Sequence, residues 1–511
     1  MLLTDELLLN YKRCQRRSYL DVYGDWGKKN PERDFVQKLR QESNNHIQTV
    51  LEESSYYQPS GNREDWELRA YETRLLMQQG VERIYQGVLS VFGQQSLRSL
   101  LALFPEEVAQ KDFDGVTFLG MPTLLIKQPG VSVFGNWQYI PVSVKLGRRP
   151  KPEYQIITAF HVLLLGVIQG NLPNKAELIL RRQNSYRVNL KTWLPRMQTL
   201  LQDCLQMLQH REEPEVFISR QRCSLCQWHS YCYTIAQSEE HLSLIPGVTP
   251  SRYQILQEAG LTTLEALAAA TPADMGEGIE PETAFILQQQ AHSLLSNCAI
   301  AKSSLNGKFP LPTAPIELYF DIEAEQERNV DYLLGVLLVN RQENTEQFYS
   351  FLAEKPDEEA IIWQHFIRFL SSYPDAPIFH FSEYEVETIK RLGNLYGTPA
   401  TEIQSILSRL VDVHQSVIKY TILPVESYSL KSVANWLGFQ WRDRGVGGDQ
   451  CICWYDQWLK SGDRTRLDAI LRYNEDDCRA TRHLKDWLVD FLENCSFDSI
   501  EEWESLPQTF S

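Results

Sequence analysis

Three successive stretches in the last third of the chain read as β-strands, because each is a short run of apolar and aromatic residues bounded by polar positions. These stretches are residues 317–325, 332–340 and 346–354. Residues 358–372 follow with apolar positions at helical spacing, and residues 376–381 read as a further strand before a run of helices. The order predicts an α/β domain over residues 316–511.

A second strand-rich region lies near the middle of the first half of the chain. Residues 115–127 and 137–147 read as strands, residues 153–170 as a helix and residues 176–182 as another strand. Helical patterns flank this centre, and the region ends in a cluster of cysteines. We therefore predict an α/β multidomain protein with a first domain over residues 1–238.

The region between these two domains, residues 239–302, has the pattern of several short helices. The turn at Ile245 to Val248 resembles the turn of a helix-hairpin-helix unit, in which backbone N–H groups face phosphate. A helical module that never contacts nucleic acid is the alternative. Residues 303–315 are rich in Ser, Pro and Gly and are predicted to be a linker.

Composition and charge indicate the broad class of protein, but they say little about its function. The chain has 511 residues, no apolar run of about 18 residues, and a net charge of −16. Its N-terminus lacks the features of a signal peptide, so we expect a cytoplasmic protein without membrane contact. Ten cysteines in such a chain indicate metal ligation for some of them. The acidic balance argues against a nonspecific polyanion binder but does not exclude a nuclease.

Two pairs of residues in the last domain have spacings suited to metal-dependent chemistry. Asp321 and Glu323 lie two apart in a predicted strand, so both carboxylates leave on one face. Tyr473 and Asp477 lie four apart in a predicted helix and again share a face. Carboxylates can hold two divalent cations about 4 Å apart, and a phenol can orient the attacking water.

A third acid is expected between these pairs, where Glu383 and Glu385 open a predicted helix. The whole order resembles the tyrosine-bearing subgroup of the DEDD exonucleases. The resemblance implies an RNase H-like fold in which Asp321, Glu323, Glu385 and Asp477 bind Mg²⁺ or Mn²⁺ and Tyr473 orients water. At the second motif the family usually has aspartate, whereas this chain has Glu385 preceded by His380.

Other readings of these acids stay open. Asp412 and Asp476 are reserve ligands, and the domain is alternatively an RNase H-like scaffold without activity. A single Asp-x-Glu pair is explained if both acids are ordinary solvated surface residues. That explanation does not account for the whole ordered set of acids and the tyrosine.

The cysteine cluster has the spacing C-x2-C-x5-C, formed by Cys223, Cys226 and Cys232. Three thiolates this close in sequence are typical of metal ligation. Together with Cys14, they resemble the iron–sulfur staple of AddB-type and CRISPR-associated RecB-like nucleases, which implies a 4Fe–4S cluster. Zinc is the alternative, because His229 completes a local set without Cys14.

The same resemblance implies a PD-(D/E)xK nuclease fold for residues 1–238. Lys145, Gln155 and His46 match motif positions, but Thr123 and Ser143 stand where that family has its two metal-binding acids. A neutral hydroxyl does not replace a carboxylate as a ligand of Mg²⁺, so this domain is predicted to have lost its nuclease activity. The alternative is that Glu153, in the following predicted helix, has taken the role of one missing acid.

Basic residues at the end of the predicted strand 137–147 are a candidate nucleic-acid contact. They are Lys145, Arg148 and Arg149, which could bind a phosphate backbone or form a solvated charge run.

The chain as a whole resembles RecB-like nucleases with an appended RNase H-like exonuclease domain. The resemblance implies a metal-dependent 3′–5′ exonuclease acting on single-stranded DNA or RNA. The alternative is a catalytically silent iron–sulfur scaffold that binds nucleic acid and recruits a helicase or a repair enzyme.

Overall fold

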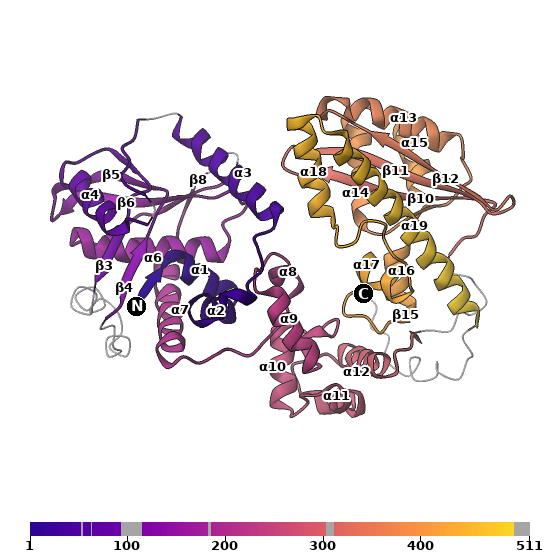
Figure 1. Cartoon of the computed structure of the whole chain (residues 1–511), viewed down its shortest axis with the longest axis horizontal. Helices are drawn as coiled ribbons and strands as arrows, with labels where there is room; N and C mark the ends of the chain where they lie inside the picture. Colours follow the sequence, from indigo (N-terminus) through magenta and orange to yellow (C-terminus); the bar gives the residue numbers. More distant parts are fainter. Residues whose placement is uncertain (53–54, 63, 93–114, 182–184, 303–310, 495–511) are drawn as a thin grey trace. The chain divides into compact units, whose positions relative to one another are not determined.

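The computed structural model describes residues 1–52, 55–62, 64–92, 115–181, 185–302 and 311–494. The chain divides into two compact units: the first comprises Met1–Val216 and Arg220–Tyr233, and the second comprises Phe217–Ser219 and residues from Thr234 onward. Both combine helices with sheets, as Figure 1 shows. Of the predicted linker 303–315, residues 303–310 lie outside the described residues, and Leu311 is buried in the core of the second unit.

The described residues of the first unit form two sheets, with strand orders β1-β4-β3 and β2-β5-β6-β7-β8. Its strands are β1 (Leu2–Thr4), β2 (Arg83–Tyr85), β3 (Leu89–Phe92), β4 (Thr117–Gly120), β5 (Leu124–Ser132), β6 (Gly135–Val144), β7 (Glu177–Ile179) and β8 (Ser185–Arg187). Its helices are α1 (Asp5–Arg13), α2 (Gln15–Tyr23), α3 (Asp34–Leu51), α4 (Trp66–Gln78), α6 (Pro152–Gln169), α7 (Leu190–His210) and α8 (Arg220–Cys223), and α9 (His229–Ser238) continues into the second unit.

Helix α6 forms the centre of the first unit because its sequence is apolar on every side. It begins at Pro152, whose fixed φ suits the first helical turn, and it ends at Gly170 in the left-handed conformation (φ 70°). Its side chains are buried against β6, β3 and α7. The strands and the helix predicted for residues 115–181 correspond to β4, β5, β6, α6 and β7, except that residues 121–123 divide the first predicted strand into β4 and β5; residue 182 lies outside the described residues.

The second unit holds the helical region and the C-terminal α/β region together. Its helices are α10 (Pro250–Glu258), α11 (Leu264–Ala269), α12 (Pro281–Ser296), α13 (Glu359–Ser371), α14 (Glu383–Leu395), α15 (Ala400–Leu407), α16 (Val413–Tyr420), α17 (Leu430–Trp436), α18 (Gly448–Ser461) and α19 (Arg464–Asn494). Its strands are β9 (Ile300–Ala301), β10 (Ile316–Glu325), β11 (Val330–Asn340), β12 (Thr345–Leu352), β13 (Ile378–His380), β14 (Leu410–Asp412) and β15 (Thr421–Ile422).

The main sheet of the second unit has the order β12-β11-β10-β13-β14. Strands β12, β11 and β10 are antiparallel neighbours, as their short connections require, and β13 and β14 run parallel to β10 after helical crossovers. The predicted strand and helix order of residues 317–381 is confirmed. The register of β10 on β11 shifts directly after Glu323, which marks a β-bulge.

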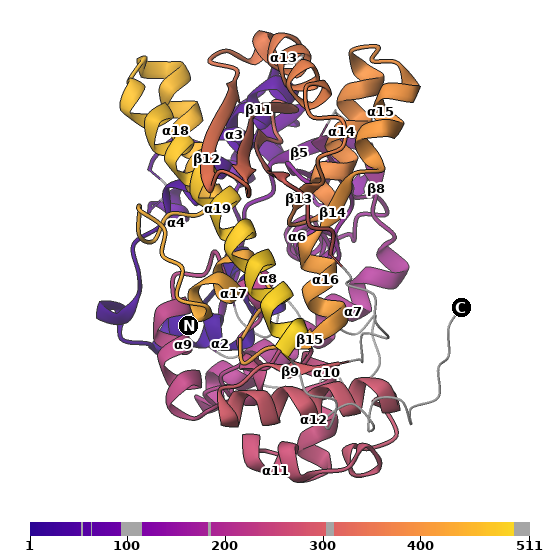
Figure 2. The same cartoon turned by 90° about the vertical axis from the view of Figure 1, so that its right-hand side faces the viewer.

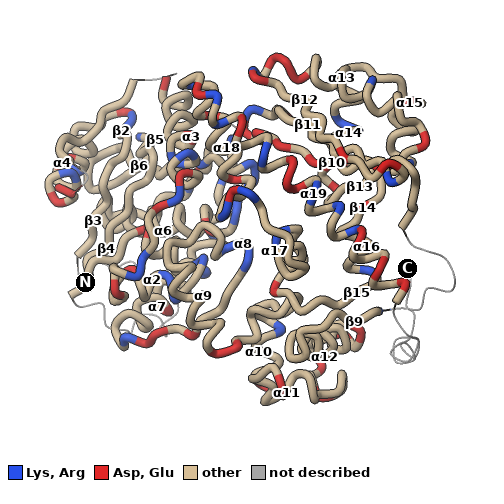
Figure 3. Tube along the Cα trace, turned by 45° about the vertical axis from the view of Figure 1, so that its right-hand side comes forward, with Lys and Arg blue, Asp and Glu red and all other residues tan. Residues whose placement is uncertain are grey.

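Alternation along β10 sends its side chains to two different cores. Phe320 packs on Phe366 of α13, with ring centroids 4.8 Å apart. Tyr319 points to the opposite face, where it stacks on Phe379 and joins the core formed with α19. Figure 2 shows α19 running across the sheet, and Figure 3 shows acidic and basic residues interleaved along that helix. Asp321 and Glu323 follow Tyr319 at a spacing of two, so they face α19.

The helical region, residues 242–297, is joined to the α/β region within the same unit. Strand β9 pairs with β15, and the buried side chain of Gln290 on α12 donates to the carbonyl of Leu423 and accepts from the hydroxyl of Tyr428. The predicted boundaries of a separate helical domain, at residues 239 and 302, stay a prediction.

Candidate active site

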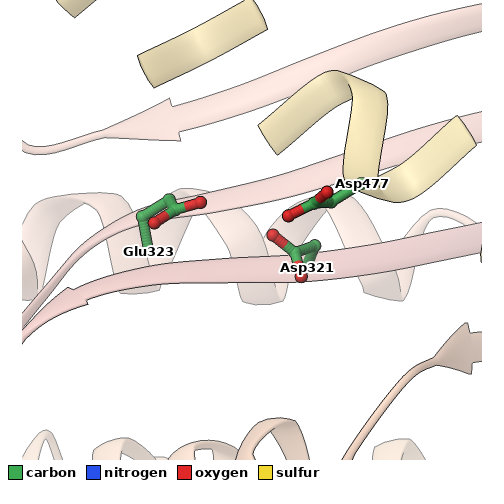
Figure 4. Close-up of side chains that lie close together, drawn as sticks. All are labelled: Asp321, Glu323 and Asp477. Carbon is green, nitrogen blue, oxygen red and sulfur yellow. The ribbon is translucent and has the colours of Figure 1, made fainter. Parts of the chain in front are cut away.

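Three carboxylates meet between the main sheet and α19. Asp321 and Glu323 come from β10, and Asp477 comes from α19. One oxygen from each lies within 4.8 Å of the others, and Figure 4 shows the three carboxylates turned toward a common point. Within the described ranges, no other His, Cys, Asp or Glu side chains bring three ligand atoms this close together.

Burial gives this cluster unusual electrostatics. Burial raises the pKa of Asp321 and of Glu323 well above the usual values, and the charge of Asp477 raises both further. Burial also raises the pKa of Asp477 to about 6, although the hydrogen bond from Trp441 and the charge of Lys431 lower it. Such a set requires protons or a cation to offset its charge. Hard divalent cations prefer carboxylate oxygen, so the donor set fits Mg²⁺ or Mn²⁺.

Tyr473 lies one helical turn before Asp477 and is buried with it. Its hydroxyl interacts with the Asp477 carboxylate and lowers the pKa of that acid. Burial and then the charges of Asp477 and Glu323 raise the pKa of Tyr473 far above its usual value. The phenol therefore stays protonated at neutral pH, and its hydroxyl is a donor beside the carboxylates.

Two residues that sequence reasoning missed hold the acids in position. Asn474, which is fully buried, donates from Nδ2 to Asp321 Oδ2 at 2.7 Å. Trp441, in the segment between α17 and α18, donates from Nε1 to Asp477 Oδ1 at 2.7 Å. The position of Asn474 directly after Tyr473 could have drawn attention to it. No spacing in the sequence connects Trp441 to Asp477, because that contact spans 36 residues.

Glu385 opens α14 but is not one of the three gathered carboxylates. Its Oε2 accepts a hydrogen bond of 2.7 Å from Ser382 Oγ and lies 3.6 Å from His380 Nδ1. Its charge nevertheless raises the pKa of Asp321, which places Glu385 within electrostatic reach of the cluster. Its assignment as the fourth ligand stays a prediction.

The two reserve acids have other partners. Asp476 accepts hydrogen bonds from the backbone and the side chain of Arg442, and Asp412 caps α16 through the backbone N–H of Gln415. Neither belongs to the group of three carboxylates found in the described residues.

The raised pKa values predict a pH dependence of metal binding. A divalent cation binds the deprotonated carboxylates, and protons compete with it until the pH exceeds the folded-state pKa of each acid. With the pKa of Asp477 at about 6 and that of Asp321 raised well above its usual value, the affinity for Mn²⁺ should rise steeply as the pH increases from 5.5 to 7.5. Calorimetric titration at several pH values measures this, and a flat profile would contradict the prediction.

The four candidate cluster cysteines all belong to the first unit. Cys14 lies between α1 and α2, Cys223 ends α8, and Cys232 lies in α9. Burial raises the pKa of Cys226 and Cys232, whereas Arg17 lowers that of Cys226 and Arg16, through its charge and a hydrogen bond, lowers that of Cys232. The charge of Cys14 acts on both of those thiols. These sulfurs are neighbours, although within the described residues no three of them lie within 4.8 Å of one another.

The predicted remnant of a second nuclease site lies at the end of β6. Thr123 Oγ1 accepts a hydrogen bond of 3.0 Å from the backbone of Val144, and Ser143 is buried beside Thr158. Burial lowers the pKa of Lys145, and the charge of Asp5 opposes that shift.

Sequence reasoning missed Asp5, which opens α1. Its Oδ2 lies 2.7 Å from Nε2 of the buried His161. The acid that interacts with Lys145 is therefore already paired with a histidine. Arg148 and Arg149 are exposed after the strand, and their contact with nucleic acid stays a prediction.

Comparison with known proteins agrees with the fold of the second unit. Residues 318–489 match the family model of the RNase H superfamily, so this part of the chain is an RNase H-like domain. The match supports a nuclease-type function on nucleic acid in general. A search of curated proteins found no match to the chain. None of the helices in the described part of the chain combines the length and the apolar character needed to cross a lipid bilayer.

Proposed function

From the match of residues 318–489 to the RNase H superfamily, we propose that the protein is a metal-dependent 3′–5′ exonuclease acting on single-stranded nucleic acid. The observation that carries the proposal is the meeting of Asp321, Glu323 and Asp477, with Tyr473 one helical turn from Asp477. An RNase H-like fold alone does not define a reaction. The carboxylates and the phenol supply the groups that phosphodiester hydrolysis needs.

Each residue has a distinct task in this proposal. Asp321, Glu323 and Asp477 would hold two Mg²⁺ or Mn²⁺ ions, with Glu385 as the fourth acid. Bound metal activates water and stabilises the charge that develops on the phosphate. Tyr473, protonated and one helical turn from Asp477, orients the attacking water through its hydroxyl. Asn474 and Trp441 fix the carboxylates, so that little reorganisation is needed when metal binds.

The test compares wild-type protein with the Asp321→Ala variant, each with Mn²⁺ and single strands labelled at either end. A 3′–5′ exonuclease shortens the 5′-labelled strand stepwise and releases the label of the 3′-labelled strand as a mononucleotide. DNA and RNA strands tested in parallel identify the substrate. If both proteins gave the same background level of cleavage, the proposal would be wrong. The alternative would then remain, a catalytically silent scaffold that binds nucleic acid and recruits a helicase or a repair partner.

We further propose that the first unit is a RecB-like domain that contacts nucleic acid through Lys145, Arg148 and Arg149 and carries a 4Fe–4S cluster on Cys14, Cys223, Cys226 and Cys232. Four thiolates at about 2.3 Å from one zinc ion would set their sulfurs about 3.8 Å apart. In the described residues no three cysteine sulfurs come within 4.8 Å, although their charges interact. The interaction of Cys14 with Cys226 and Cys232 supports the set of four cysteines, which includes Cys14, over the local zinc set completed by His229.

A cysteine variant tests the cluster. We expect anaerobically purified wild-type protein to be brown and to contain iron and sulfide, and the Cys232→Ser variant to lose the colour and the iron because one of four ligands is missing. Cys298→Ser, which changes an exposed cysteine, is the control and should keep both. A colourless wild-type protein with one zinc per chain would overturn the assignment.

A further inference from the structure

Lys431 is a half-buried lysine of α17 whose ammonium lies beside two aromatic rings of the candidate site. Its Nζ lies 4.7 Å from the centroid of the Tyr473 ring and 5.5 Å from that of Trp441. Burial lowers the pKa of Lys431, and the charge of Asp477 is the largest influence that opposes the shift. In return, the charge of Lys431 lowers the pKa of Asp477 and of Glu323. The ammonium therefore lies within the electrostatic field of the proposed metal site.

The side-chain ammonium of Lys431 forms no ion pair with a carboxylate among the described residues. Arg442 nearby pairs with Glu475 and Asp476, whereas Lys431 has no ion pair within 4.0 Å in the described part of the chain. It donates to the backbone carbonyl oxygen of Val446. An ammonium has three N–H donors, so the side chain can still donate to a ligand beside the carboxylates.

The position of α17 is fixed from several sides. The segment before it is held by Gln290, which donates to the carbonyl of Leu423 and accepts from Tyr428 Oη at 3.1 Å. The end of α17 is held by Trp436, whose Nε1 donates to Asn297 Oδ1 at 3.1 Å. The helical region therefore contributes to the placement of the lysine, which sits on a rigid element as a site residue must.

We propose that Lys431 is a further catalytic residue of the proposed exonuclease, which contacts a non-bridging oxygen of the phosphate being cleaved. The inference rests on the proposed function. Carboxylates and bound metal would face one side of the phosphate, and the ammonium would supply a fixed positive charge where negative charge develops in the transition state. The lysine takes no part in proton transfer; it binds and orients.

This placement has two opposite consequences. A fixed positive charge near the carboxylates repels a divalent cation and so weakens metal binding. The same charge attracts the substrate phosphate and stabilises the transition state. A lysine that only packs against Tyr473 and Trp441 would affect fold stability but would not change metal affinity in one direction and turnover in the other.

The experiment uses the full chain with Lys431→Met, which keeps an unbranched side chain one atom shorter and removes its charge. We expect the variant to bind Mn²⁺ about three- to tenfold more tightly in calorimetric titration without substrate, and to cleave a labelled single strand at least about tenfold more slowly at saturating Mn²⁺. Lys431→Arg keeps the charge, so its Mn²⁺ affinity should match the wild type. Lys419→Met is the matched control, since Lys419 is exposed on α16 and lies 5.1 Å from the centroid of the Tyr420 ring.

The two readouts separate this inference from the proposed function. Unchanged or weaker Mn²⁺ binding by Lys431→Met would overturn the role of Lys431, whether or not the wild-type protein is a nuclease. If Lys431→Met binds Mn²⁺ more tightly but wild-type protein cleaves no strand, the placement beside the metal site is supported and the exonuclease proposal fails. If wild-type protein is active and Lys431→Met is equally active, the catalytic role is wrong and the exonuclease proposal stands.

Discussion

Asp477→Asn is expected to reduce metal-dependent cleavage by about a thousandfold or more, which corresponds to about 4 kcal/mol of transition-state stabilisation. The change is nearly isosteric. The amide oxygen of asparagine can still accept the hydrogen bond that Trp441 Nε1 donates to Asp477 Oδ1. What is lost is the negative charge, and with it a ligand for the divalent cation. The measurement is the initial rate of cleavage of a labelled single strand across a range of Mn²⁺ concentrations.

The same variant is expected to make the metal-free protein more stable. Burial raises the pKa of Asp477 from its usual 3.8 to about 6, so the folded state binds this proton more tightly than the unfolded state. Stability is therefore lost as the pH rises from about 4 to about 6, and above that range the charged carboxylate costs about 3 kcal/mol. Asparagine removes this cost.

Thermal unfolding in the presence of a chelator measures the difference. The variant should melt above the wild type at pH 8, and the gap should shrink toward pH 4, where the native aspartate is neutral. Glu343→Gln is a suitable control, because Glu343 is exposed in the turn between β11 and β12. If the Asp477→Asn variant melted below the wild type at pH 8, the charged carboxylate of Asp477 would not destabilise the folded protein, and the prediction would be wrong.

These opposite effects on activity and stability point to the reason for the cluster. Burial raises the pKa of Asp321, Glu323 and Asp477, and the charge of Asp477 raises the pKa of the other two further. Keeping all three carboxylates charged in the folded protein is therefore unfavourable without a cation. Strained arrangements of this kind persist where they serve a function, and they identify candidate sites. A neutral core at this position would be more stable and would bind no metal.

The sequence allowed the elements that carry the acids to be predicted because those signals are local. The spacing of two between Asp321 and Glu323 places both on one face of a strand, and the spacing of four between Tyr473 and Asp477 places both on one face of a helix. These relations need no knowledge of how distant segments meet.

The contacts that complete the site are not local, and no pattern predicted them. Trp441 reaches Asp477 across 36 residues and Asn474 reaches Asp321 across 153. The interaction of Asp5 with Lys145 likewise depends on how α1 packs against α6. Such pairs are determined by packing of whole elements, and a single sequence contains no spacing that reports it.

Gly335→Ala is expected to destabilise the protein by about 2–3 kcal/mol and to lower the cleavage rate about tenfold or more. Gly335 lies opposite Asp321 in the pairing of β11 with β10. A Cβ added there would lie 1.7 Å from Asn474 Oδ1 and 2.8 Å from Asn474 Cγ. Asn474 is fully buried, so its side chain has to leave the position from which it donates to Asp321. Chemical denaturation and the cleavage assay measure the two effects.

A double variant separates the clash from the loss of the hydrogen bond. Asn474→Ala removes the atoms that meet the new Cβ, so Gly335→Ala combined with Asn474→Ala should be more stable than the sum of the single changes predicts. The cleavage rate should stay low, because Asp321 still lacks its donor. Gly448→Ala is the control, since a Cβ at Gly448 meets nothing within 4 Å. If the double variant recovered the rate as well, Asn474 would have no part in orienting Asp321, and Gly335 would matter for packing alone.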